Sequence, residues 1–395
     1  MRAGGDGYAV AARAGAIRFR YRLTFDDTVP VSTGAALSPS HLYAVTGALF
    51  AAPEAANPAG EAPLRLRLHV GVPPGWEVVT GWGVGDRTFT PPNRRALLGS
   101  TLAAAPDFRL YRDTAAGTRF VLAIRGERRF ADTALARVIA ASLREARALL
   151  GPVPVPRVTY VADVGATGST SASLQGRATV GLLWGSGDSL GLPRIHDVFH
   201  ETLHLWFGGV LQTARWWTEG VTDYYAARLQ SEWSGRAGDL ATLIFRSLDD
   251  YLRIPRRTRM TMDQEARANV LGDNTTLLVY RKGMLAALLL DAAIRRSTGG
   301  SASLDDVARE ALALARSRAD GRVAESELRA LAIAAGGPAV GALWTRVVAG
   351  DTLLSREEVA AALRAVTRRR AVADPAGGAS RGRRRRTRQT MRRTS

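Results

Sequence analysis

The sequence contains no cysteine and no long apolar run. Without cysteine there can be no disulfide, thiolate ligand or thiol nucleophile, so any metal site must rest on histidine and carboxylate side chains. A cysteine-free chain tolerates oxidising and reducing compartments alike, so this absence does not indicate a location. No stretch reaches the roughly 18 consecutive apolar residues of a membrane-spanning helix. The longest, residues 284–290, is expected to form a core helix.

Lysine is nearly absent as well. Lys282 is the only lysine among 54 basic residues, and the other 53 are arginine. In a chain with this bias, a retained lysine indicates a position where the planar guanidinium group is a poor substitute for a compact ammonium group. Alternatively, this lysine has been retained by chance. We assign Lys282 no catalytic role.

Positive charge is concentrated at the C-terminus. Of the net charge of +18, residues 368–395 carry +10, from eleven arginines and one aspartate, which leaves +8 for the rest. We expect a disordered basic tail over residues 371–395. Such a tail could bind nucleic acid or an anionic membrane through phosphate contacts. A solvated tail enlarged by arginine-favouring coding bias is the simpler explanation.

Three of the five histidines lie between positions 196 and 204, and two of them frame a glutamate in the run His200-Glu201-Thr202-Leu203-His204. On a helix, His200 and His204 leave the same face and can bind one metal ion. Glu201 lies beside that face, where it can accept a proton from a metal-bound water. The apolar flanks and the glycine pair at 208–209 predict a buried helix that ends there. Two hydrogen-bonded core histidines are the alternative.

A second segment with helical spacing of aromatic residues covers residues 216–229. A zinc ion with two histidine ligands takes a third protein ligand and keeps one position for water. Glu219, with fourteen residues between it and His204, is the best candidate, and Asp223 would then orient a ligating imidazole. The two acids can exchange roles, because Asp223 is also within reach. His196 either lines this site or is an ordinary histidine on the helix face.

These motifs resemble the glycyl aminopeptidase family of gluzincin metallopeptidases, which are relatives of the alanyl aminopeptidases and of thermolysin. The resemblance rests on His-Glu-x-x-His-x-Trp at 200–206, Trp-x-x-Glu-Gly-x-Thr-Asp-Tyr-Tyr-Ala at 216–226 and Tyr-x-Lys-Gly at 280–283, with its continuation to residue 308. It covers residues 60–366 and is strongest at 195–229 and 276–308.

The resemblance implies a zinc peptidase that binds one Zn²⁺ per chain through His200, His204 and Glu219. It also implies that Tyr280 stabilises the oxyanion formed when water attacks a peptide carbonyl. Without the resemblance, a tyrosine ahead of a leucine-rich helix would be interpreted as a packing residue.

One position departs from the pattern of related aminopeptidases. Gln175 stands where they carry the glutamate that binds the substrate's α-amino group, and Gly176 follows it in the expected substrate-binding strand. A neutral amide accepts hydrogen bonds but cannot form an ion pair with an ammonium group. Exopeptidase activity is therefore an open question.

The resulting fold prediction is a multidomain α+β protein with four regions. We expect an N-terminal β-sandwich-like domain over 1–125, a thermolysin-like catalytic domain over 126–235, a helical domain over 236–370, and the tail. Strands are predicted at 17–23, 64–70, 120–123, 157–162 and 179–184, and helices at 133–150, near 195, and at 276–297, 304–317, 324–335 and 355–366.

The chain ends also differ from the family pattern. The first fifteen residues lack the apolar run of a secretory signal, and the PDZ module usual in the family has no counterpart after residue 366. Since family members often begin with additional strands and are often exported, we expect the chain to start inside its first domain. It would be cytoplasmic as it stands, and exported if a leader precedes it.

Together these features predict a zinc metallopeptidase of aminopeptidase type that acts on peptides. An endopeptidase of the same fold is the first alternative. A non-catalytic zinc-containing protein that binds partners through its basic tail is the second.

Overall fold

The computed structural model describes residues 2–4, 7–9, 20–23, 35–51, 66–164, 171–175, 178–255, 260–270 and 277–367. The predicted basic tail and Gly176 lie outside these residues. The chain divides into two compact units. One comprises Met1–Leu110, Leu122–Glu127 and Thr159–Gly185, and the other comprises Tyr111–Val121, Arg128–Val158 and Ser186–Ser395.

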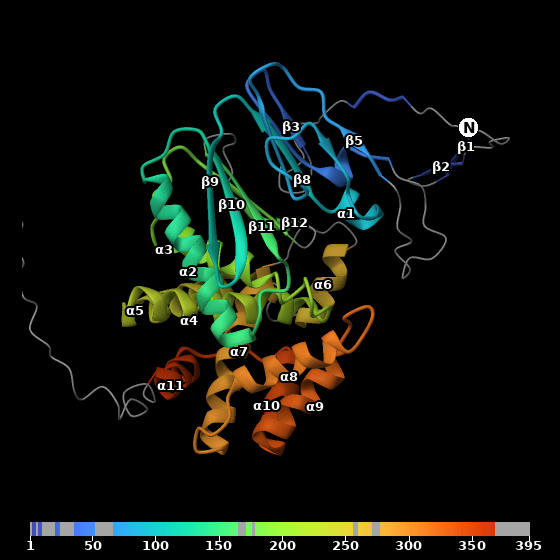
Figure 1. The fold of residues 1–395 in the computed structure, drawn as a ribbon. Coiled ribbons are helices and arrows are strands. Elements are labelled where there is room, and N and C mark those ends of the chain that lie inside the picture. Colours follow the sequence, from blue (N-terminus) through green and yellow to red (C-terminus); the bar gives the residue numbers. More distant parts are fainter. Residues whose placement is uncertain are drawn as a thin grey trace, which may run out of the picture. The chain divides into compact units, whose positions relative to one another are not determined.

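Four sheets are formed by the described residues (Figure 1). An antiparallel sheet has the strand order β3-β4-β8-β6, and a mixed sheet has the order β12-β13-β11-β10-β9, in which β13 is parallel to β11 and antiparallel to β12. Two further antiparallel pairs are β1-β2 and β5-β7. The strands are β1 Arg2–Gly4, β2 Gly7–Ala9, β3 Ala35–Leu37, β4 Leu42–Val45, β5 Leu68–His69, β6 Glu77–Thr80, β7 Thr88–Phe89, β8 Thr101–Ala105, β9 Arg109–Ala115, β10 Thr118–Arg125, β11 Arg157–Val164, β12 Ser171–Gln175 and β13 Thr179–Trp184.

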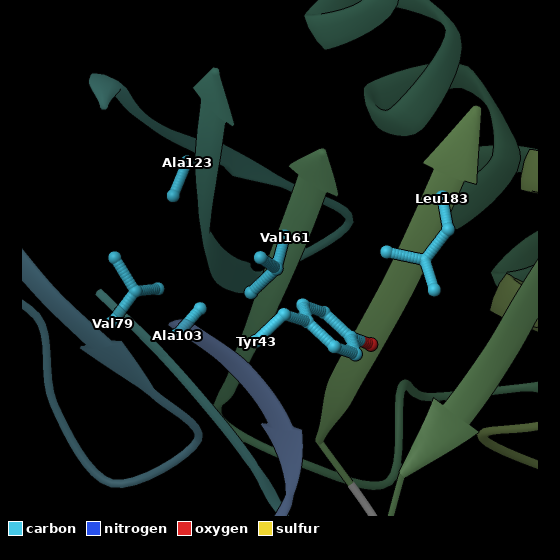
Figure 2. Packing of buried hydrophobic residues seen from close by; sticks show 6 residues of the cluster. All are labelled: Tyr43, Val79, Ala103, Ala123, Val161 and Leu183. Carbon is cyan, nitrogen blue, oxygen red and sulfur yellow. The ribbon is translucent and has the colours of Figure 1, made fainter. Parts of the chain in front are cut away.

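The core of the first unit lies between two sheets. Figure 2 shows side chains from β4, β6 and β8 facing side chains from β10, β11 and β13, all of them at most 3% exposed. The cluster consists of Tyr43, Val79, Ala103, Ala123, Val161 and Leu183. The four-stranded sheet also contributes Val78, Leu102 and Ala104 to a cluster with Phe89 of β7. Because successive side chains of a strand point to opposite faces, one short sheet can contribute to both clusters.

Helices make up most of the second unit. They are α2 Asp132–Leu150, α3 Leu192–Leu203, a π-helical turn at Trp217–Val221, α4 Thr222–Ser234, α5 Ala237–Arg253, α6 Met262–Val270, α7 Leu277–Ser297, α8 Leu304–Arg316, α9 Glu325–Gly336, α10 Pro338–Trp344, a second π-helical turn at Thr345–Ala349, and α11 Arg356–Thr367. The first unit holds the five-residue helix α1 Arg94–Leu98 and a 3₁₀ turn at Thr46–Ala48. Among the described residues, none of the helices has both the length and the apolar character of a membrane span.

Most predicted elements are confirmed. The strand predicted at 179–184 and the helices predicted at 133–150, 276–297, 304–317, 324–335 and 355–366 are observed with ends shifted by at most one residue. The strand predicted at 64–70 is wrong in extent, since within its described part only Leu68–His69 is a strand, paired with the equally short β7. Of the strand predicted at 17–23, only residues 20–23 are described, and they form no strand.

Helix α7 is the central helix of the second unit and contacts α4, α5, α6, α8, α9, α10 and α11. Its apolar run at 284–290 is buried throughout, as predicted. A polar network also fixes α7 beside α4 and α8. Tyr224 of α4 donates a 2.6 Å hydrogen bond to Asp291 of α7, and Arg228 forms a two-point pair with Asp305 of α8 at 2.7 and 3.0 Å. Buried polar groups with partners of this kind specify one arrangement of helices.

Lys282 on α7 is completely buried. Its ammonium group donates a 2.7 Å hydrogen bond to the carbonyl oxygen of Gly350, which follows the second π-helical turn. Burial lowers the pKa of Lys282 from its usual 10.5 to about 8, although the nearby charge of Asp351 opposes this shift. The only lysine of the chain therefore joins α7 to a distant segment, in a buried position where a larger guanidinium group would require repacking.

The lowered pKa predicts that stability rises with pH in the alkaline range. Between about pH 8 and 10.5 the unfolded chain keeps the Lys282 proton while the folded chain loses it, so raising the pH favours folding. We expect the free energy of unfolding to increase by about 1.5 kcal/mol from about pH 8 to about pH 9.5, relative to a Lys282→Met variant. Urea unfolding of both proteins across this range measures the difference. Equal slopes in the two proteins would show that Lys282 does not titrate in this way.

Candidate metal centre

The run His200–His204, which the sequence predicts to bind a metal, lies at the end of α3. The helix was expected to reach the glycine pair at 208–209, but it ends at Leu203, and His204 is its C-cap residue. The helix begins with Pro193 in its first turn, and Val198, Phe199 and Leu203 pack into the core. Its opposite side carries the histidines, because residues four positions apart share a helix face. His200 and Glu201 are each only 6% exposed, so these polar groups are buried and need partners.

Glu219 comes from the π-helical turn that precedes α4. Its Oε2 atom lies 3.6 Å from Nε2 of His200 and 3.4 Å from Nε2 of His204. In a tetrahedral zinc site with bonds of about 2.0–2.1 Å, two ligand atoms are separated by roughly 3.4 Å. The spacing of these atoms therefore fits corners of one zinc coordination sphere. The π-helical turn was not predicted, since the sequence pattern of residues 216–229 is that of an ordinary helix.

Both histidines use their other ring nitrogen to bind the protein. Nδ1 of His200 lies 2.8 Å from Oδ1 of Asp223, and Nδ1 of His204 lies 2.9 Å from the carbonyl oxygen of Phe207. A carboxylate and a carbonyl can only accept, so each Nδ1 donates and carries the proton. In the neutral ring Nε2 is then an acceptor. When both rings are neutral, three acceptors therefore meet at one point, and either a proton on Nε2 or a bound cation compensates them.

The electrostatics of the cluster favour positive charge. Burial alone would lower the pKa of His200, but Asp223 raises it well above the usual value. Burial also opposes protonation of His204, yet Glu219 and Glu201 raise its pKa. Conversely, the histidines lower the pKa of Glu219 despite the burial of its carboxyl group. A divalent metal ion would replace the protons that these shifts reflect.

Glu201 offers a carboxylate oxygen within 4.8 Å of the ligand atoms of His200 and His204. Burial raises its pKa, against the opposing effect of the two histidines. Its Oε2 atom is buried and has no hydrogen-bond partner in the described part of the chain. A buried carboxylate oxygen without a partner is costly in the resting protein, but it suits a group that receives a proton.

Tyr280, in the first turn of α7, approaches the cluster at His200. Its ring is stacked at 24° on the His200 imidazole with 6.0 Å between the ring centroids. Burial and the charge of Glu219 raise the pKa of Tyr280, so the phenol remains a hydrogen-bond donor at every physiological pH. The structure thus brings together residues that are almost eighty positions apart.

The π-helical turn and α7 touch through two glycines. A Cβ atom on Gly220 would lie 2.4 Å from the Cα atom of Gly283 and 2.6 Å from the carbonyl oxygen of Val279. A Cβ atom on Gly283 would lie 3.0 Å from the Cα atom of Gly220. Gly220 directly follows Glu219, and Gly283 lies one turn after Tyr280. The closeness of the two backbones therefore sets the distance between the Glu219 carboxylate and the Tyr280 ring.

His196 belongs to this site, although the sequence left its role open. Its Nε2 atom lies 3.0 Å from the same Asp223 oxygen that accepts from His200. Arg281 of α7 also approaches the other Asp223 oxygen, at 3.7 Å. Burial would raise the pKa of Asp223, but His200 and His196 lower it, so the carboxylate stays ionised. The spacing of His196, one turn before His200, was the only signal in the sequence.

Of the two predicted substrate-binding residues, only Gln175 is described. It is the last residue of β12 and pairs in register with Thr179 of β13, so the predicted strand is present. Gly176 lies outside the described residues.

No known protein-family profile and no curated protein matches the sequence. Solved structures do. An aminopeptidase N family protein from Idiomarina loihiensis aligns with a TM-score of 0.71 and 19% identity over 83% of this chain and 62% of that chain. An M1 zinc metallopeptidase from Deinococcus radiodurans aligns with a TM-score of 0.55 and 18% identity over 83% of this chain and 74% of that chain. A variant of the Deinococcus enzyme bound to the peptide Tyr-Ser-Ala aligns with a TM-score of 0.56 and 16% identity, over 84% of this chain and 74% of that chain.

At these identities the comparisons establish the fold. The chain has the mixed α+β architecture of M1-type metallopeptidases, with sheets followed by a helical C-terminal region. It spans 62% of the Idiomarina structure's length, which is less than two thirds of that chain.

The contact between Gly220 and Gly283 predicts that alanine substitutions at three glycines lower stability and zinc binding to different extents. Gly220→Ala should destabilise the protein by at least about 1–3 kcal/mol and weaken zinc binding, because its methyl group meets backbone that cannot give way. Gly283→Ala, with 3.0 Å contacts, should have a smaller effect, and Gly238→Ala on α5 should have almost none, because its Cβ would meet nothing within 4 Å. Thermal unfolding and zinc content of the three variants test the series. Equal behaviour of all three would contradict it.

Proposed function

We propose that this protein is a zinc metallopeptidase, and that its family is that of the gluzincin enzymes whose fold it shares. The observation that carries this proposal is the convergence of Glu219 Oε2 on the Nε2 atoms of His200 and His204 at 3.6 and 3.4 Å. The unpartnered oxygen of Glu201 beside these atoms supports hydrolysis in addition to metal binding. A peptide ligand in a structure of the same fold supports peptides as the substrate class.

In this proposal His200, His204 and Glu219 hold one zinc ion. Zinc bound there would act as a Lewis acid, which lowers the pKa of a coordinated water and polarises a carbonyl oxygen. Asp223 and the Phe207 carbonyl orient the two imidazoles through their Nδ1 atoms.

The remaining residues handle protons and charge. Glu201 accepts a proton from the attacking water and passes it to the leaving amine, a role that its unpartnered buried oxygen supports. Tyr280 donates a hydrogen bond to the oxyanion that develops on the scissile carbonyl. Its raised pKa keeps that proton on the phenol.

Separating metal binding from proton transfer tests this assignment. Glu201→Gln should retain about one zinc per chain but lose hydrolysis by about 10²–10⁴-fold, because the amide cannot accept the proton. Glu219→Gln should lose zinc affinity instead. Glu310→Gln, at an exposed position on α8, serves as the matched control and should change neither property. Zinc content by mass spectrometry and a mixed-peptide cleavage assay measure both. Wild-type activity in Glu201→Gln would exclude the mechanism.

We propose further that the enzyme cleaves without requiring a free substrate N-terminus. The support is Gln175, which stands at the aligned position of the amine-binding glutamate and carries no charge. This favours the endopeptidase alternative over a strict aminopeptidase within the glycyl aminopeptidase-like group. Because the basic tail lies outside the described residues, a role for it in nucleic-acid or membrane binding remains a prediction from the sequence alone.

A comparison of free and N-acetylated peptides tests this second proposal. The wild type should cleave both forms with kcat/KM values within about tenfold, since an ion pair worth more than about 1.4 kcal/mol is missing. Gln175→Glu should raise the preference for the free form, whereas Gln175→Ala should leave the ratio unchanged. If the wild type cleaves only free peptides, one residue at a time, Gln175 does not decide the specificity.

A further inference from the structure

The first turn of α7 is held by a carboxylate from the preceding helix. Oε1 of Glu265 on α6 accepts a 3.1 Å hydrogen bond from the backbone N–H of Leu278, and Oε2 accepts a 2.9 Å bond from the N–H of Val279. Glu265 is 1% exposed, and Leu278 and Val279 are completely buried. The contact therefore lies out of water, where each hydrogen bond contributes most to a fixed geometry.

A helix cannot satisfy the N–H groups of its own first turn. At an exposed helix start, water would bind them, but here burial leaves the two N–H groups dependent on Glu265. A carboxylate is also favoured at this end of a helix by the helix dipole. Glu265 consequently fixes the orientation of the turn that contains Leu278 and Val279.

The next residue after this cap is Tyr280. On its other side, one turn later, Gly283 is in backbone contact with Gly220. Tyr280 is thus enclosed between two fixed points of α7, one formed by the Glu265 carboxylate and one by the glycine pair. If the Glu265 contact is lost, the turn that carries Tyr280 is no longer fixed. The proposed zinc ligands on α3 and on the π-helical turn stay in place.

We propose that Glu265 is a positioning residue that aims the Tyr280 hydroxyl at the reacting carbonyl. The proposal rests on the function proposed above. Glu265 acts through the backbone of α7 and not on the substrate. Both carboxylate oxygens are needed, since a glutamine at this position would accept from one N–H and turn its own NH₂ group toward the other.

Substitutions of Glu265 in two backgrounds test this role. Glu265→Gln should lower kcat by about 10–100-fold with little change in KM or zinc content, because a displaced oxyanion donor affects mainly the transition state. In a Tyr280→Phe background the same substitution should lower kcat by less than about twofold, since the group it positions is gone. Asp263→Asn, an exposed acid on the same helix, is the control and should have no effect.

A second measurement does not depend on activity. In protein labelled with 3-fluorotyrosine, the fluorine resonance that disappears in Tyr280→Phe identifies Tyr280, and Glu265→Gln should shift or broaden that resonance selectively. Glu265→Asp provides a milder variant if Glu265→Gln does not fold. An unchanged Tyr280 resonance would overturn the proposal, and so would an equal loss of kcat in both backgrounds. If the wild type hydrolyses no peptide, the proposed function fails, whereas the fluorine spectra still decide whether Glu265 positions Tyr280.

Discussion

The candidate metal centre depends on one close contact between backbones, that of Gly220 with Gly283. Any side chain on Gly220 would overlap the backbone of α7. Because Glu219 precedes the first glycine and Tyr280 lies one turn before the second, the contact places a ligand-type carboxylate and a phenol around the same histidines. A separate polar network joins α4 to the neighbouring helices, through Tyr224 to Asp291 of α7 and through Arg228 to Asp305 of α8.

The π-helical turn at Trp217–Val221 is a local departure with a clear geometric role. A π-helical turn contains about one residue more than an α-helical turn, and such turns are frequent at functional sites. Here it carries Glu219 to the Nε2 atoms of His200 and His204, while Asp223, just beyond the turn, meets the Nδ1 atom of His200. One short segment therefore contacts opposite edges of one imidazole. Glu219 therefore lies at the Nε2 atoms of both histidines and Asp223 at Nδ1 of His200, an arrangement that supports the preferred assignment of Glu219 as the ligand.

Charge compensation in the site is arranged in layers. The inner layer consists of three atoms that a bound cation would bring together, namely Glu219 Oε2 and the Nε2 atoms of His200 and His204. Around it, Asp223 is shared by His196 and His200 and is faced by Arg281. A buried carboxylate with this many partners stays ionised, and an ionised partner at Nδ1 makes the opposite nitrogen of His200 a better donor to metal. His196 thus affects the proposed zinc site indirectly, through Asp223, which also binds His200.

The sequence by itself determined what is local. The spacing of His200 and His204 fixes two imidazoles on one face of α3, and the apolar periodicity predicted α2, α7, α8, α9 and α11 nearly to the residue, since these patterns act within a few turns of chain. Only the tertiary structure decided what depends on distant packing. The partnership of His196 with Asp223, the cap that Glu265 places on α7 and the approach of Tyr280 to His200 each join separate helices. No periodicity encodes such contacts, because they arise only when buried polar groups must find partners in the folded chain.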